Sequence, residues 1–262
     1  MLSRALLFVC VSAAPLAAQR TGLDSRRPFE ISDNSFLVEE AFNQEAGIFQ
    51  NILLFQWPNS REWSLEFTQE WPVGSQRHQF SYTIPVERVV DGVDADIRRG
   101  TIALNYRYQL TTEESWFAAT SPRMSFLFPD APEDDRHFGL QFNLPLSKQF
   151  ANLYVHANAG LTIDGISSDA GADTRPHVAG SLIYRLLPMV HLMFESVYRV
   201  NEHDLPTGNN DSWVISPGVR AGWNLGDKQL VLGIAVPIGV LHDGETQNLL
   251  AYLSYELPFM RR

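Results

Sequence analysis

The sequence has a single cysteine, few basic side chains and, beyond its first residues, no long apolar run. Cys10 lies in the N-terminal apolar stretch, so the chain that remains after removal of that stretch has no thiol. Disulfides, thiolate catalysis and cysteine metal sites are therefore excluded from the mature protein. The 30 Asp and Glu residues outweigh the 20 Lys and Arg residues, for a formal charge of −10. This balance argues against nucleic acid as a partner, because phosphates require a basic surface.

A helical membrane protein needs about 20 consecutive apolar residues, and no such run follows the N-terminus. Hydrophobic residues nevertheless make up 45% of the chain and aromatic residues 11%. The mature protein is therefore expected either to be soluble or to cross a membrane as strands that alternate apolar and polar side chains.

The N-terminus has the three parts of a secretory signal peptide. Arg4 gives a positively charged start, residues 5–14 form a short apolar core, and Ala17 and Ala18 provide the small side chains that precede cleavage. We predict that residues 1–18 are removed and that the mature chain is exported.

The exported chain is predicted to have two parts, a periplasmic N-terminal segment at 19–46 and a β-barrel at 47–262. The N-terminal segment lacks period-2 alternation and has at most a short helix that begins at Ser35. It either enters the barrel lumen as a plug or hangs in the periplasm, and the sequence leaves both arrangements open.

Period-2 alternation of apolar and polar side chains dominates the rest of the chain and is typical of strands. Its segments of about ten residues match the 9–11 residues of a tilted transmembrane strand. Pro122 and Pro217 fall inside two segments, where we expect bulges or shifted boundaries because proline lacks the N–H of a paired strand. The twelve predicted strands are 47–57, 61–71, 76–85, 101–110, 114–128, 138–146, 153–161, 176–186, 189–200, 212–224, 228–239 and 247–259.

The connections between these segments alternate in length, as in bacterial barrels with short periplasmic turns and longer extracellular loops. Tight turns are predicted near 72–75, 111–113, 147–149, 187–188 and 225–227, and long loops at 86–98, 129–136, 164–176, 201–211 and 241–247. The five long loops carry 16 acidic residues against 4 arginines. We therefore predict twelve strands, with ten and fourteen as alternatives, both termini in the periplasm, and an acidic extracellular rim.

The apolar face of the strands is predicted to contact lipid, whereas in a soluble barrel it would point inward. All six tryptophans lie at or near strand ends, where membrane barrels place an aromatic girdle. Trp213 and Trp223 share one face, and their separation spans roughly 25 Å of bilayer on a strand tilted by about 40°. The predicted girdle residues are Trp63, Trp71, Trp116, Trp213 and Trp223.

Three segments carry a family resemblance: Phe67–Phe80, Leu104–Leu110 and Glu39–Gly47. They resemble uncharacterised outer-membrane "transporter" proteins grouped with the barrel of the phenol meta-degradation pathway, and the likeness covers most of the mature chain. The resemblance implies a channel for small solutes, hydrophobic or aromatic compounds among them, and brings no catalytic residues. The end Tyr255–Phe259 also resembles the aromatic signal read by barrel-assembly machinery, although Met260 and two arginines follow it here.

The polar face carries charges that we predict to line the lumen. The three glutamates of one strand form either a cation-attracting strip or ion pairs with the arginines of the following strands. We favour the pairs, because unpaired charges are costly in a narrow lumen. Glu195 is expected to pair with Arg185 or Arg220 in the same way. The full set is Glu62, Glu66, Glu70, Arg77, Arg107, Arg123, Arg185, Glu195, Arg199 and Arg220.

No catalytic or metal site is predicted. His156 and His191 point inward, but neither has a serine at a spacing typical of a Ser–His pair, and Ser196 is predicted to face away from His191. No His or Asp cluster has ligand spacing. Asp91–Asp96 is interpreted as a solvated acidic loop, because it lacks the downstream Glu of a calcium motif. We therefore expect neither an enzyme nor a bound cofactor.

These features predict an all-β protein: a single antiparallel transmembrane β-barrel in the outer membrane of a Gram-negative-type bacterium, preceded by a short periplasmic segment. Its expected partners are outer-membrane lipid, the barrel-assembly machinery and a small solute of unknown identity. The leading hypothesis for its function is a channel or transporter for small solutes. The alternative is a closed barrel with a structural or interaction role and no flux.

Overall fold

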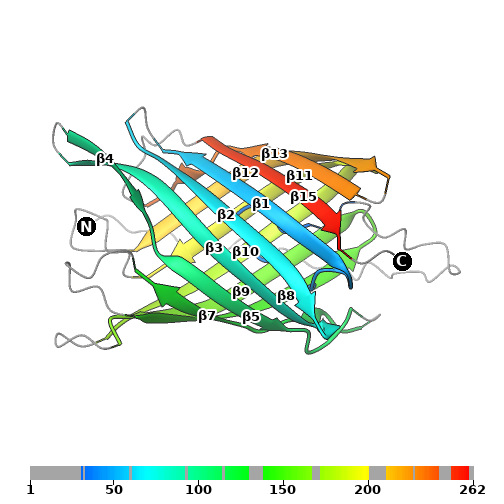
Figure 1. The fold of residues 1–262 in the computed structure, drawn as a ribbon. Coiled ribbons are helices and arrows are strands. Elements are labelled where there is room, and N and C mark those ends of the chain that lie inside the picture. Colours follow the sequence, from blue (N-terminus) through cyan, green and yellow to red (C-terminus); the bar gives the residue numbers. More distant parts are fainter. Residues whose placement is uncertain are drawn as a thin grey trace, which may run out of the picture.

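A computed structural model describes most of the chain from residue 31 onward (Figure 1). The predicted signal peptide at 1–18 and the first part of the predicted periplasmic segment, 19–30, lie outside the described residues. The described residues are 31, 33–58, 61–91, 94–113, 116–129, 138–166, 172–200, 211–226, 228–241 and 249–259.

Twelve antiparallel strands close into one barrel. Each strand pairs with the next along the chain, and the first and last, blue and red in Figure 1, lie side by side along the register from Ile48↔Pro258 to Trp57↔Leu249. The predicted fold class is confirmed, and ten or fourteen strands are excluded. The strands are β1 (Ile48–Trp57), β2 (Trp63–Val73), β3 (Ser75–Asp91), β5 (Ile102–Tyr108), β7 (Arg123–Phe128), β8 (Gly139–Phe150), β9 (Leu153–Asp164), β10 (Asp173–Leu187), β11 (Val190–Arg199), β12 (Ser212–Leu225), β13 (Lys228–Ala235) and β15 (Leu249–Pro258).

Tight turns gather at one end of the barrel, which we call the short-turn end; the opposite end is the long-loop end. The β2–β3 and β12–β13 hairpins turn at Gly74 and Gly226, whose φ angles are 70° and 71°. L side chains rarely adopt this conformation, and a Cβ at either position would meet nothing within 4 Å. The backbone conformation, rather than lack of space, therefore requires glycine at these two turns.

Prolines interrupt two of the predicted strands. The segment predicted at 114–128 forms only β6 (Ala119–Thr120) and β7, which are separated at Pro122. The connection before it is correspondingly longer than the turn predicted at 111–113. Pro237 likewise separates β13 from β14 (Ile238–Gly239). Pro217 stays inside β12 opposite Phe194, and its carbonyl accepts the N–H of Val236 at 3.0 Å.

The predicted loop at 86–98 is a hairpin rather than an irregular loop. β3 continues to Asp91 and pairs with β4 (Asp94–Arg99), a two-stranded extension beyond the barrel (Figure 1). Residues 92 and 93 lie outside the described residues, so the acidic-loop interpretation of Asp91–Asp96 stays a prediction.

The barrel is apolar outside and polar inside. On β5, the side chain of Leu104 is outward and 47% exposed, whereas its neighbour Asn105 is inward and 4% exposed. This is the reverse of a soluble barrel, in which water-facing residues are polar. Exposed apolar side chains recur around the wall, among them Phe80, Phe126, Phe142, Leu182, Phe194, Trp223 and Ile234.

The predicted girdle residues lie near strand ends, and their interfacial role stays a prediction. Trp213 and Trp223 are exposed on β12, and Trp213 Nε1 donates to Ser196 Oγ at 3.0 Å. Trp116 is 80% exposed in the connection between β5 and β6. Trp63 and Trp71 are half-buried on β2 against Phe55 and Phe49, respectively. None of the described residues forms a helix, and so none forms a helix long enough to span a bilayer.

Candidate functional site: a plugged lumen

The chain before β1 lies inside the barrel. Residue 31 and residues 33–46, which we call the plug, are buried or half-buried except for the exposed Glu45 and Ala46, yet have no regular secondary structure. The short helix predicted from Ser35 is absent from these residues. The structure thus has the arrangement in which the N-terminal segment enters the lumen, and the site is built from the plug and the polar inner wall.

Apolar side chains of the plug fit into wall positions that carry glycine. A Cβ at Gly233 would lie 2.2 Å from Phe36 Cζ, and a Cβ at Gly222 would lie 2.8 Å from Ile31 Cγ1. Phe36 also packs against the ring of Tyr252, with 5.0 Å between centroids. Both plug residues are buried in the main hydrophobic cluster of the protein, which therefore forms between plug and wall.

Backbone groups of the plug bond to wall side chains in place of a strand partner. The N–H groups of Leu37 and Val38 donate to Glu195 Oε1 at 2.8 and 3.1 Å. Glu39 N–H donates to Asn158 Oδ1 at 2.9 Å, and Asn158 Nδ2 returns a bond to the Glu39 carbonyl. Irregular backbone at membrane depth requires such partners, because lipid offers none. Further bonds of this kind join Ala41 to Ser147, Asn43 to Gln109 and Gln44 to Gln79.

Two arginines of the wall meet the carboxylate of Glu39. Arg123 Nη1 lies 2.8 Å from Glu39 Oε1, and Arg107 Nη1 lies 3.9 Å from Glu39 Oε2. Arg107 also lies 3.6 Å from Glu70 Oε2 and donates to the Glu40 carbonyl at 2.9 Å. Arg107 is thus held between a carboxylate of the wall and one of the plug, and Arg123 contacts the carboxylate of the plug.

A second charged cluster surrounds Glu40 of the plug. Its Oε1 atom lies 3.6 Å from both His156 Nε2 and Arg220 Nη2. Arg220 Nη1 also donates to the carbonyls of Asp33 and Asn34 at 2.6 and 2.9 Å. Burial raises the pKa of Glu40 to about 8 and raises the pKa of Asp33, although Arg220 opposes both shifts.

A Ser–His contact is present that sequence spacing did not reveal. Ser147 Oγ lies 2.7 Å from His156 Nδ1, because the two residues are direct partners in the β8–β9 register. Ser147 Oγ also accepts the N–H of Ala41 at 2.7 Å, so its hydroxyl hydrogen is free to point to the histidine. The chain Ala41–Ser147–His156–Glu40 begins and ends in the plug and anchors it. The predicted turn at 147–149 ended the strand before Ser147, whereas β8 continues to Phe150 and so pairs Ser147 with His156.

The predicted ion pairs are present only in part. Glu70 contacts Arg107 as expected, but the nearest carboxylate to Arg123 belongs to Glu39 of the plug. Glu66 lines the interior, and Glu62 precedes β2 at the long-loop end, so the three glutamates do not act as one strip. Arg77 is exposed near the start of β3, at the short-turn end rather than at a strand centre.

The prediction that Glu195 pairs directly with Arg185 or Arg220 is wrong. Register places Glu195 opposite Ser181 and Ser216, whereas Arg185 and Arg220 both lie opposite His191. Glu195 accepts from the plug amides instead. Arg185 donates to Asn152 Oδ1 at 2.9 Å near the short-turn end. Arg199 lines the cavity at the long-loop end.

Three cavities surround the plug. The outer cavity, at the long-loop end, has a volume of about 420 Å³; the inner cavity, at the short-turn end, has about 400 Å³. A side cavity of about 190 Å³ lies between the plug and strands β1–β5. Glu39, Leu37 and Arg123 line both the outer and side cavities, and Asn34, Glu70 and Arg107 line both the side and inner cavities.

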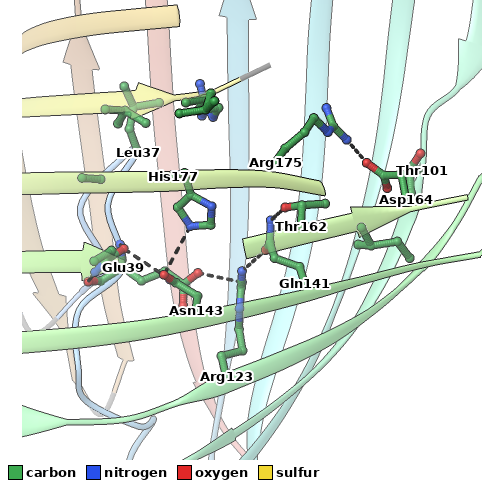
Figure 2. A pocket seen from close by; sticks show the side chains of 16 residues that line it. Leu37, Glu39, Thr101, Arg123, Gln141, Asn143, Thr162, Asp164, Arg175 and His177 are labelled. Carbon is green, nitrogen blue, oxygen red and sulfur yellow. Dashed lines mark hydrogen bonds and ion pairs between the residues drawn. The ribbon is translucent and has the colours of Figure 1, made fainter. Parts of the chain in front are cut away.

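The outer cavity is lined mainly by polar groups (Figure 2). Arg123 contacts Glu39 and Gln141, and Gln141 Nε2 donates to Thr162 at 3.0 Å. Arg175 is paired with Asp164 on the neighbouring strand. Within the described residues, no group of three His, Cys, Asp or Glu residues could hold a metal ion.

A closed twelve-strand antiparallel barrel with an apolar exterior and a polar interior has the architecture of bacterial outer-membrane barrels. Solved structures that share it include a channel and a porin. The chain is similar to the COG4313 outer membrane channel from Pseudomonas putida F1, with a TM-score of 0.57, 11% identity and coverage of 87% of this chain and 99% of that one. It is also similar to the NanC porin, with a TM-score of 0.51, 8% identity and coverage of 81% and 100%. No family model matches the sequence, and no curated protein matches it.

Proposed function

We propose that this protein is an outer-membrane channel that admits small solutes around its plug. The observation that supports the proposal is the chain of three cavities. Consecutive cavities share lining residues, Glu39 and Arg123 at the first junction and Glu70 and Arg107 at the second. The COG4313 channel and the NanC porin, which have the same fold, support the same class of function. In this proposal the short-turn end faces the periplasm and the long-loop end faces the outside.

The route is expected to be narrow and selective. A twelve-strand barrel lies between eight-strand barrels, whose interiors are filled, and barrels of sixteen or more strands, which leave an open channel. Here the plug also occupies the centre, so a solute must pass the arginine–glutamate pairs. The proposal includes hydrophobic or aromatic solutes, which the family resemblance implies. It also includes assembly through the Tyr255–Phe259 end and location in an outer membrane.

The proposal is tested by comparing the mature chain with a variant that lacks residues 20–40, both refolded and inserted into planar bilayers. The mature chain should conduct weakly, and deletion of the segment should raise the single-channel conductance several-fold, because it removes the wall contacts of Phe36, Glu39 and Glu40. Folding is checked by the change in electrophoretic mobility on heating, so that a misfolded variant is not scored as closed.

A closed structural barrel is the second candidate, favoured by the number of bonds that hold the plug. If both proteins insert correctly yet conduct no ions and pass no small solute in liposome-swelling assays, this candidate replaces the channel. Equal, substantial conductance from both would instead mean that the plug does not control the route.

A further inference from the structure

Two arginines face each other across neighbouring strands in the lumen. Arg107 of β5 and Arg123 of β7 are direct partners in the antiparallel register. Like charges at directly opposite positions destabilise a strand pair, and burial increases the cost; the side chains of Arg107 and Arg123 are only 5% and 21% exposed. The pair therefore requires an anion beside it.

Glu39 of the plug supplies an anion that both arginines share, with one carboxylate oxygen directed to each, and Glu70 of the wall lies 3.6 Å from Arg107. The Nε–H groups of both Arg107 and Arg123 are buried and have no hydrogen-bond acceptor among the described residues. The two guanidinium groups thus retain donors that the Glu39 carboxylate does not use. A carboxylate carried by another molecule could bond to the same two groups in its place.

The position of Glu39 makes such an exchange accessible from the long-loop end. Its side chain is 23% exposed and lines the outer cavity, whose volume lies in the range of small-molecule sites, roughly 300–1,000 Å³. That cavity carries three arginines and two carboxylates, so its lining has a net positive charge even while Glu39 is in place. An entering anion therefore meets favourable potential at the plug.

The same cavity has an apolar side. Leu37 of the plug and Ala179 and Val197 of the wall line it together with Arg123. A ligand that fits both sides has one carboxylate and a small apolar body.

We propose that the outer cavity binds small organic monocarboxylates, and that the bound carboxylate takes the place of Glu39 on Arg123 and Arg107. The inference rests on the proposed channel function and names its solute class. When the solute carboxylate replaces Glu39, the plug loses its ion pairs with Arg123 and Arg107. Binding of the solute therefore also loosens the plug beside the junction between the outer and side cavities.

The test measures benzoate binding to the refolded mature chain in detergent by calorimetry, with benzyl alcohol as the uncharged probe. The Glu39→Gln variant lacks the carboxylate that competes with benzoate for the two arginines. Benzoate should therefore bind to this variant at least tenfold more tightly than to the unmodified chain. Benzyl alcohol should show no such gain. Adding Arg123→Gln to Glu39→Gln should abolish the gain, because bonds to charged groups are worth roughly a tenfold or greater change in affinity. Glu87→Gln, which makes the same charge change in the hairpin outside the barrel, should bind as the unmodified chain does.

Equal benzoate affinity in all these proteins would overturn the site. Because Glu39→Gln leaves two arginines facing each other and could impair folding, Arg123→Gln alone provides a second measurement. It relieves the repulsion and should lower benzoate affinity of the otherwise unmodified chain. Flux separates the two proposals: benzoate binding without any solute flux contradicts the channel alone, whereas glycerol flux without benzoate preference contradicts the monocarboxylate site alone.

Discussion

The ring of Phe36 occupies the space that a side chain at residue 233 would need. Phe36 Cζ would lie 2.2 Å, and Cε1 2.5 Å, from a Cβ built on Gly233, distances that real Cβ atoms do not adopt. Gly218 on the adjacent strand approaches the same ring. The wall therefore has glycine where the Phe36 ring of the plug enters, and plug and wall are complementary in shape as well as in polarity.

This complementarity predicts that a side chain at residue 233 releases the plug. Gly233→Leu should displace Phe36 and weaken docking by roughly 1–3 kcal/mol, the usual cost of overpacking. The variant should open more often in planar bilayers, and its N-terminal segment should be cleaved faster by protease. Gly180→Ala is the matched control, because its Cβ would meet only the His156 carbonyl at 3.7 Å. Identical behaviour of the two variants would contradict a docked plug.

The outward face of β5 predicts opposite responses at two neighbouring residues. Leu104→Arg should impair insertion by about 2–4 kcal/mol, because an unpaired cation would face the bilayer. Asn105→Arg points inward and should be tolerated far better. Refolding yield into lipid vesicles, followed by urea titration, measures both. If Asn105→Arg proves more damaging than Leu104→Arg, the barrel is inside out.

The wall of the barrel could be predicted from the sequence because its signal is local. Alternation over ten residues fixes which side chains face lipid, and a register shift of one residue would turn each side chain to the other face. Leu104 and Asn105 therefore fell on the predicted faces. The break at Pro122 was also foreseeable, because proline cannot complete a ladder of hydrogen bonds.

The contents of the lumen could not be predicted in the same way. The plug has no periodicity, because its backbone groups bond to wall side chains such as Glu195 and Asn158 instead of to a neighbouring strand. Pairing wall charges only with one another therefore gave Arg123 the wrong partner. The glycine at 233 carried a further signal, since glycine inside a strand often marks a close approach, but it does not identify what approaches.

The loop lengths predict which end of the barrel faces the outside. A cysteine placed at Asp169 or Asn209, in long loops that lie outside the described residues, should be labelled on intact cells by a membrane-impermeant reagent. A cysteine at Gln149, near the short-turn end, should be labelled only after the outer membrane is permeabilised. The mature chain has no other thiol, so labelling reports the introduced residue alone. Equal labelling of both ends on intact cells would overturn the orientation.

The buried carboxyl of Glu40 predicts that docking of the plug depends on pH. Arg220 and His156 contact it, and Asp33, Arg107 and Glu195 lie near enough to influence it. Burial raises its pKa from the ordinary value of 4.5 to about 8 in the docked plug. In a released plug, Glu40 loses its proton near pH 4.5, its ordinary pKa. In the docked plug, Glu40 keeps its proton until about pH 8. Docking is therefore strongest below about pH 4.5 and weakens as pH rises toward about 8.

The open fraction in planar bilayers should accordingly increase as pH rises through this interval at constant salt. Glu40→Gln is neutral at every pH and nearly isosteric, so its open fraction should stay close to the low-pH value of the unmodified chain. Glu87→Gln, on the external hairpin, should keep the full pH dependence. A response that persists in Glu40→Gln would assign the titration to another group, such as His156 or Asp33. An open fraction that falls with rising pH would mean that ionised Glu40, through Arg220 and His156, holds the plug more firmly than the neutral acid.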